Sequence, residues 1–176
     1  MSRALKLVPN YNYEDYRTWK GRWEVHDGLA IAMSPMATPK HQRIASFLSR
    51  VLGNALEDSN CKECLDYQPL DLVIKENNIV QPDLLIVCKP IEKKYLDFPP
   101  ALVVEIHSPS TKLNDINIKY NLYQDFGIKY YVMIDPDEHT VKCFELDEDG
   151  IYQRKEKSNF TFDDGCTIDL DLSNIF

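Results

Sequence analysis

The chain has 176 residues, of which 44% are hydrophobic and 27% are charged, with a formal net charge of −8. These fractions are typical of a globular protein that buries roughly 70% of its unfolded surface, so they exclude a disordered or disulfide-dependent chain. The negative charge excludes a uniformly basic nucleic-acid-binding surface. Any contact with nucleic acid must therefore use a local basic patch, or metal ions that neutralise an acidic pocket.

The sequence shows no signal for a membrane or for export. No apolar run is long enough to span a bilayer, and the N-terminus lacks the hydrophobic segment of a signal peptide, so we expect a cytoplasmic protein without a membrane partner. Of the five cysteines, only Cys61 and Cys64 have C-x-x-C spacing. No second closely spaced pair completes a metal site. The pattern favours reduced thiols at a helix-to-strand junction, with redox or zinc chemistry as the alternative.

The N-terminal third predicts a helix, a hairpin and a second helix. Asn12 is a suitable N-cap for a helix over residues 13–19. Asp27-Gly28 predicts a tight turn between strands at 23–25 and 29–33. Thr38-Pro39 then marks the start of a helix that runs to about residue 56. Its apolar residues recur at helical spacing and form one face: Ile44, Phe47, Leu48, Val51, Leu52, Ala55 and Leu56.

The rest of the chain is rich in strands. LDLVIKENNIVQPDLLIVC, residues 70–88, predicts two strands joined by a turn at Asn77-Asn78. ALVVEIH, residues 101–107, is apolar on both faces and predicts a central strand. A helix at 112–127, closed by Gly127, precedes strands at 129–136 and 140–146, and Asp164-Gly165 predicts a further turn. This order predicts an α/β (α+β) fold with one central mixed sheet flanked by helices, formed by residues 1–176 as a single domain.

Two acids interrupt the apolar strands. Asp83 follows Pro82, and Glu105 lies within ALVVEIH. If these strands are neighbours in suitable register, alternation brings both carboxylates to one face. Pro82 cannot donate to a sheet ladder, so it marks a strand start or a bulge. Burying one unpaired carboxylate costs several kcal/mol or raises its pKa, whereas a divalent cation bound between two carboxylates stabilises both in their ionised form. Carboxylate oxygens favour Mg²⁺, Mn²⁺ or Ca²⁺ over zinc.

Three more polar residues lie in apolar settings. At 100° per residue Lys119 falls between Tyr123 and Phe126, inside the apolar arc of its helix, so its stem can be buried while its ammonium reaches Glu105. His41 falls on the apolar face of the long helix, and Glu24 lies between Trp23 and Val25.

Each of these residues also has a purely structural interpretation. His41 could be a satisfied core histidine and Glu24 a solvated residue at a strand edge. Asp83 could cap a turn, and Glu105 could form a structural ion pair with Lys119. The functional interpretation rests on the set of five together.

The segments QPDLLIV, VVEIHSPST and NIKYNLYQDFGIKYYVMIDP resemble a large family of mostly uncharacterised bacterial proteins that are described as restriction endonucleases. The resemblance extends upstream through YNYEDY, WEVHDGLAIAMSP and HQRIASFL, and covers residues 11–146. It implies the restriction-endonuclease-like nuclease fold, whose signature is P-D, a spacer and then (D/E)-x-K. Pro82-Asp83 matches the first half, and Glu105, 22 residues later, matches the acid of the second.

The signature departs from the family pattern at its lysine. His107 stands where the signature has lysine, and Lys119 matches the lysine that such families carry on the following helix. The resemblance implies that Glu24 is an additional acid and that His41 matches the histidine opening the long helix. Both results, from the helical wheel and from the resemblance, assign Lys119 to the site.

The resemblance implies a Mg²⁺-dependent endonuclease that hydrolyses phosphodiester bonds of DNA, with Mn²⁺ as a substitute. Asp83, Glu105 and the backbone carbonyl of Ile106 would hold the metal, and Glu24 would ligate a second ion or a metal-bound water. Lys119 would orient or deprotonate the attacking water or stabilise charge on the phosphate, and His41 would contact phosphate or support the site. By analogy with nucleases of this fold, we expect a homodimer. Two alternatives are a non-catalytic module that binds nucleic acid or protein, and a structural dimer that only binds Ca²⁺ or Mg²⁺.

Overall fold

A six-stranded mixed sheet forms the centre of the molecule. The computed structural model describes residues 8–33, 37–108, 115–162 and 165–176. The strand order is β10-β9-β8-β7-β6-β3, with β7 and β8 parallel and all other neighbours antiparallel. These strands are β3 (Leu65–Tyr67), β6 (Leu84–Val87), β7 (Leu102–Ile106), β8 (Tyr130–Asp135), β9 (Thr140–Leu146) and β10 (Tyr152–Lys155). The predicted mixed sheet is confirmed, and β7 is central and fully buried as expected.

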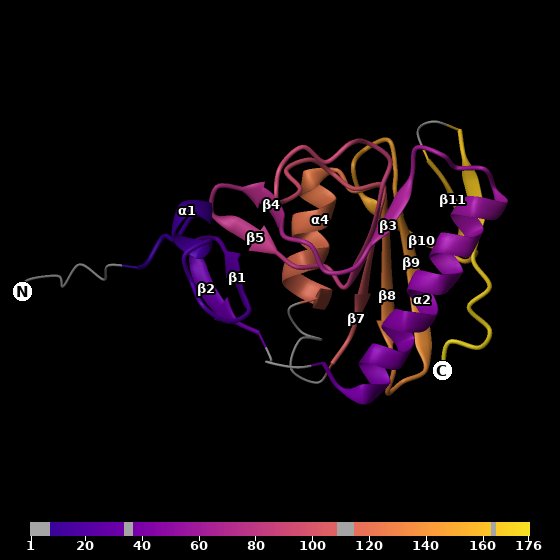
Figure 1. Ribbon diagram of the computed structural model, residues 1–176, viewed down its shortest axis with the longest axis horizontal. Coiled ribbons are helices and arrows are strands. Elements are labelled where there is room, and N and C mark those ends of the chain that lie inside the picture. The colour runs from indigo at the N-terminus through magenta and orange to yellow at the C-terminus, as the bar shows by residue number, and fades with distance from the viewer. Residues whose placement is uncertain (1–7, 34–36, 109–114, 163–164) are drawn as a thin grey trace, which may run out of the picture.

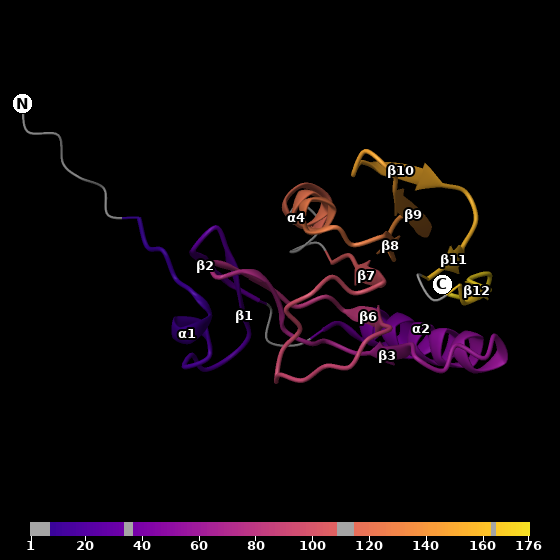
Figure 2. The same cartoon turned by 90° about the horizontal axis from the view of Figure 1, so that it is seen from above.

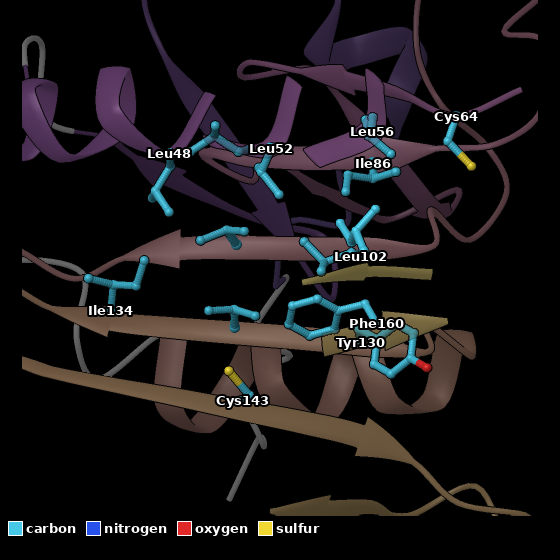
Figure 3. Packing of buried hydrophobic residues seen from close by; sticks show 14 of the residues in the cluster. Leu48, Leu52, Leu56, Cys64, Ile86, Leu102, Tyr130, Ile134, Cys143 and Phe160 are labelled. Carbon is cyan, nitrogen blue, oxygen red and sulfur yellow. The ribbon is translucent and has the colours of Figure 1, made fainter. Parts of the chain in front are cut away.

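Helices α2 (Pro39–Asp58) and α4 (Tyr120–Phe126) cover opposite faces of this sheet (Figures 1 and 2). Strand alternation sends Leu84 and Ile86 toward α2, and Leu85 and Val87 toward α4. Helix α2 buries the predicted stripe Ile44, Leu48, Leu52 and Leu56, part of which is seen in Figure 3. The hairpin of β11 (Asn159–Thr161) and β12 (Thr167–Asp169) closes the same cluster. Within the described ranges, no helix is long and apolar enough to cross a membrane.

A second sheet carries the N-terminal part of the chain. Its order is β2-β1-β5-β4, with β1 at Trp23–His26, β2 at Leu29–Ala32, β4 at Leu72–Lys75 and β5 at Asn78–Val80. Helix α1 (Tyr13–Tyr16) precedes it and is capped by Asn12, as predicted.

The prediction of one continuous strand after the Asn77-Asn78 turn was wrong. The chain leaves the small sheet after β5 and enters the large sheet at β6, with Gln81, Pro82 and Asp83 between them. The physical reason is Pro82, which has no N–H with which to continue a ladder. The predicted acid Asp83 therefore lies where the chain passes from one sheet to the other.

The helix expected at 112–127 has two parts. A π-helical turn, η1 (Asp115–Lys119), leads into α4, and Gly127 ends the helix with a left-handed φ of 82°. Residues 112–114, and Asp164 of the predicted C-terminal turn, lie outside the described residues. A π turn often marks a functional site, and this one ends at Lys119.

The expectation of reduced thiols at Cys61 and Cys64 was wrong. Cys61 is disulfide-bonded to Cys166, and Cys64 to Cys88, whereas Cys143 is buried and forms no disulfide. The partners are separated by 105 and 24 residues in the sequence. Close spacing reveals only local pairs, so the sequence pattern could not show that the fold brings these four residues together.

Candidate functional site

Asp83 and Glu105 come together at the ends of two adjoining strands. Strands β6 and β7 pair with Leu84 opposite Val104, so the next step of this register places Asp83 opposite Glu105. The backbone N–H of Ile106 donates to Oδ2 of Asp83 over 2.8 Å, which fastens the start of β6 to the end of β7. Directly opposed residues share one face of an antiparallel pair. The structure thus brings the Asp83 carboxylate to the backbone next to Glu105, and metal binding by these two acids stays a prediction.

Lys119 lies between two acids from different sheets. Its Nζ is 2.8 Å from Oε1 of Glu24 on β1 and 3.0 Å from Oε1 of Glu105 on β7. All three side chains are buried, each with only 3% of its surface exposed. The helical wheel placed Lys119 in the apolar arc, and the structure buries it there. The wheel assumed 100° per residue, which does not hold across the π turn that positions this lysine.

Glu24 is held on both of its oxygens. Oε1 accepts a bond of 2.8 Å from the backbone N–H of Gln81, and Oε2 lies 3.0 Å from Nε2 of His26. Burial alone would raise the pKa of Glu24, but the charge of Lys119 and the hydrogen bonds from His26 and Gln81 outweigh it and lower the pKa to about 2. Glu24 is therefore ionised at neutral pH and positions the Lys119 ammonium. Metal ligation by Glu24 stays a prediction.

His41 approaches Asp83 from the other side of the sheet. It lies in the first turn of α2, where its backbone N–H donates to the capping hydroxyl of Thr38. Its Nε2 lies 3.1 Å from Oδ2 of Asp83. About 15% of the His41 side chain and 17% of the Asp83 side chain are exposed, so this edge of the site is open to solvent while the Lys119 side is closed. The structure thus gathers Glu24, Lys119 and Glu105 in one buried cluster and His41 and Asp83 in a second. The backbone N–H of Ile106, the residue after Glu105, links the second cluster to β7.

Two further members of the buried cluster were missed by sequence reasoning. The hydroxyl of Tyr123 donates to Oε1 of Glu105 over 2.6 Å, and His26 contacts Glu24 as described above. Burial, followed by the charge of Glu105, raises the pKa of Tyr123, so the phenol stays a neutral donor. Signals for both were present in the sequence: Tyr123 follows Lys119 by one helical turn, and His26 shares a strand face with Glu24.

The charges of the two clusters together leave room for a cation. Three carboxylates and one ammonium give a net charge of −2 when the histidines are neutral. Among the residues that the structure covers, no three His, Cys, Asp or Glu side chains form a ready-made metal cage. Mg²⁺ at phosphate sites usually needs only one or two carboxylates, because water and substrate phosphate complete its octahedron. The hard oxygens of Asp83 and Glu105 fit that requirement.

Comparison with known proteins places the chain in a family. Residues 13–172 match the Uma2 profile, described as "Putative restriction endonuclease". The chain belongs to the Uma2 family. An uncharacterized Synechocystis protein is 27% identical over 150 residues, which cover 81% of this chain and 77% of that protein. A crystal structure from Anabaena variabilis, titled a "putative nuclease belonging to DUF820", shares the fold with a TM-score of 0.67 at 18% identity, over 84% of this chain and 85% of that one.

Family membership confirms the resemblance seen in the sequence, and the shared fold confirms the predicted architecture. This Uma2 chain carries histidine at the signature's lysine position. His107 is buried, its backbone N–H donates to the carbonyl of Ile134, and its Nδ1 lies 3.9 Å from Oδ2 of Asp135 on β8. The side chain is thus directed toward an acid of the neighbouring strand, and Lys119 supplies the ammonium next to Glu105.

Proposed function

We propose that this Uma2-family protein is a metal-dependent endonuclease that hydrolyses phosphodiester bonds of DNA. The observation that carries the proposal is the buried ammonium of Lys119 in contact with Glu105, whose strand is fastened to Asp83. A protein gains little stability from such a cluster, since burying an ion pair is often no better than apolar packing. Perturbed, buried charges at one edge of a sheet are instead typical of active sites. The family description supports the same reaction class.

The cation would be Mg²⁺, or Mn²⁺ in its place, held by Asp83, Glu105 and the carbonyl oxygen of Ile106. When bound, such an ion lowers the pKa of water and stabilises charge on phosphoryl oxygens. The Ile106 N–H and His41 both contact Oδ2 of Asp83 and so fix the direction of that carboxylate. Such supporting contacts orient ligands and commonly change metal affinity by about 10–100-fold.

Lys119 is the residue we assign to the attacking water or to the charge that develops on the phosphate. Glu24 and Glu105 hold its Nζ at 2.8 and 3.0 Å, and Tyr123 holds Glu105 in turn. His41 lies at the solvent-accessible edge of the site, where a phosphate backbone could approach it. Lys119 would thus place a fixed ammonium beside Glu105, one of the two carboxylates that we assign to the metal.

The decisive test is cleavage of supercoiled plasmid, single-stranded DNA and RNA with Mg²⁺ or Mn²⁺. We expect metal-dependent cutting of DNA by the wild type and its loss in Lys119→Ala and Asp83→Asn. Lys155→Ala is the matched control, because Lys155 also pairs with a carboxylate, that of Glu145, on strands β9 and β10 away from the site. Cutting that survives Lys119→Ala would remove this lysine from the mechanism.

A second candidate is a non-catalytic module that binds nucleic acid or protein on the nuclease fold. The net charge of −8 and the histidine at position 107 favour it. Absence of cutting by folded wild type, across several metals and substrates, together with retained DNA binding, would support this alternative. Sedimentation of the pure protein tests the homodimer that we propose by analogy with other nucleases of the fold.

A further inference from the structure

Four cysteines gather at the end of β6 opposite to Asp83. Asp83 immediately precedes β6 and Cys88 immediately follows it. Cys64 lies opposite Cys88, one step beyond the register that pairs Leu65 with Val87, and their Cα atoms are 3.9 Å apart. Figure 3 shows Cys64 at one end of the apolar cluster, near Leu56 and Ile86.

The two disulfides meet in a single turn. The backbone N–H of Cys64 donates to the carbonyl of Cys61 over 3.2 Å, which closes a turn over the C-x-x-C segment. Residues in this relation have Cα atoms within about 7 Å. The Cα atoms of Cys61 and its partner Cys166 are 5.6 Å apart. One turn therefore joins the two disulfides, and through them the segment after α2, the start of β3, the end of β6 and the C-terminal hairpin.

We propose that, in reduced form, Cys61, Cys64, Cys88 and Cys166 bind one Zn²⁺ as a tetrahedral four-thiolate site. Zinc takes four sulfurs at about 2.3 Å, so neighbouring sulfurs lie about 3.8 Å apart, and C-x-x-C is a usual spacing for one pair of ligands. Each bonded sulfur pair needs to separate by about 2 Å to reach that geometry. In the disulfide form the described cysteines form no metal group.

The redox step balances with a dithiol reductant. Each protein disulfide accepts two electrons and two protons from one molecule of the reductant, whose own two thiols become a disulfide. Two such steps yield four cysteine thiols, and these release their protons when zinc binds them as thiolates. Where a thiol pool keeps proteins reduced, clustered cysteines more often bind metal than form disulfides. A surface pocket lined by Cys61, Lys62 and Cys64 gives reductant and metal a path to the buried sulfurs.

Metal titration of the full chain, reduced under nitrogen, tests the site. We expect one Co²⁺ per chain with the visible bands of tetrahedral cobalt thiolate, displaced one-for-one by Zn²⁺. Cys88→Ser and Cys166→Ser should each weaken cobalt binding by more than about 100-fold. Losing a residue that only supports a metal ligand already lowers metal affinity by about 10–100-fold, and these changes remove a ligand itself. Cys143→Ser is the matched control and should bind like the wild type, because Cys143 is outside the group. Stoichiometric binding unchanged in Cys88→Ser and Cys166→Ser would overturn the proposal.

A second measurement covers the case in which reduction unfolds the protein. Native mass spectrometry of protein purified under nitrogen from zinc-supplemented cells should show one zinc with all cysteines reduced. The mass of two disulfides without zinc would refute the site, and an iron–sulfur mass would replace zinc with the other metal group that four thiolates select. These readouts do not involve DNA cleavage, so zinc binding and nuclease activity succeed or fail separately.

Discussion

Replacing Lys119 with methionine tests whether one ammonium holds two sheets together. Methionine keeps the length of the apolar stem but removes the charge that lies 2.8 Å from Glu24 and 3.0 Å from Glu105. Both acids are 3% exposed, so water cannot replace the lost partner. Removing one member of a buried ion pair typically costs about 3–5 kcal/mol. We expect the free energy of unfolding, from urea titration at pH 7 in EDTA, to fall by that amount.

A double-mutant cycle separates the ion pair from the general effect of the substitution. Glu24→Gln removes one of the two stranded charges, so Lys119→Met should be milder in that background by about 1–3 kcal/mol. Lys155→Met is the control, because its pair with Glu145 is partly exposed and should contribute less than about 1 kcal/mol. A loss below about 1 kcal/mol for Lys119→Met, or a coupling energy near zero, would refute the view that Lys119 is the internal counter-ion of the site.

Three further predictions concern the same two clusters. Asp83→Asn should lower the cleavage rate at least about 100-fold. It should change the free energy of unfolding by less than about 1 kcal/mol, because the amide oxygen still accepts the Ile106 N–H. A large loss of stability in urea titration would instead indicate a structural role for Asp83. Folding lowers the pKa of Glu24 from its ordinary 4.5 to about 2. The ionised carboxylate therefore contributes about 3 kcal/mol to the free energy of unfolding above pH 4.5, and this contribution is lost as the pH falls through 2. Acid titration in EDTA should show this loss of stability in the wild type and a flatter profile in Glu24→Gln. Tyr123→Phe should lower the unfolding free energy by about 1.5–3 kcal/mol, since it deletes the 2.6 Å bond to Glu105; no change in thermal or urea unfolding would contradict that value.

Local patterns in the sequence predicted most of the fold. The helical period of Ile44, Leu48, Leu52 and Leu56 predicted the buried face of α2, and the apolar run at 102–106 predicted the central strand. These predictions succeed because amphipathic periodicity is imposed by burial, which dominates folding. Polar residues inside such apolar runs were equally visible, and so the five candidate site residues could be named from the sequence.

Contacts between distant segments could not be predicted. The Cys61–Cys166 pair spans 105 residues, and no spacing rule connects them. The split between β5 and β6 depends on which sheet each half joins, and that is decided by packing. His26 was missed because a single histidine beside an acid on a strand is common, and only the fold shows that it contacts the oxygen of Glu24 that Lys119 does not occupy.

Short strand β6 is fastened at both of its ends, one of which carries the candidate site acid Asp83. Only four residues separate Asp83 from Cys88. The Ile106 N–H fastens the first end to β7, and the Cys64–Cys88 disulfide fastens the second end to the start of β3. Catalytic groups must be held to within about 0.5 Å. A bond at each end of β6 ties the strand to a different neighbour, which limits the movement of Asp83.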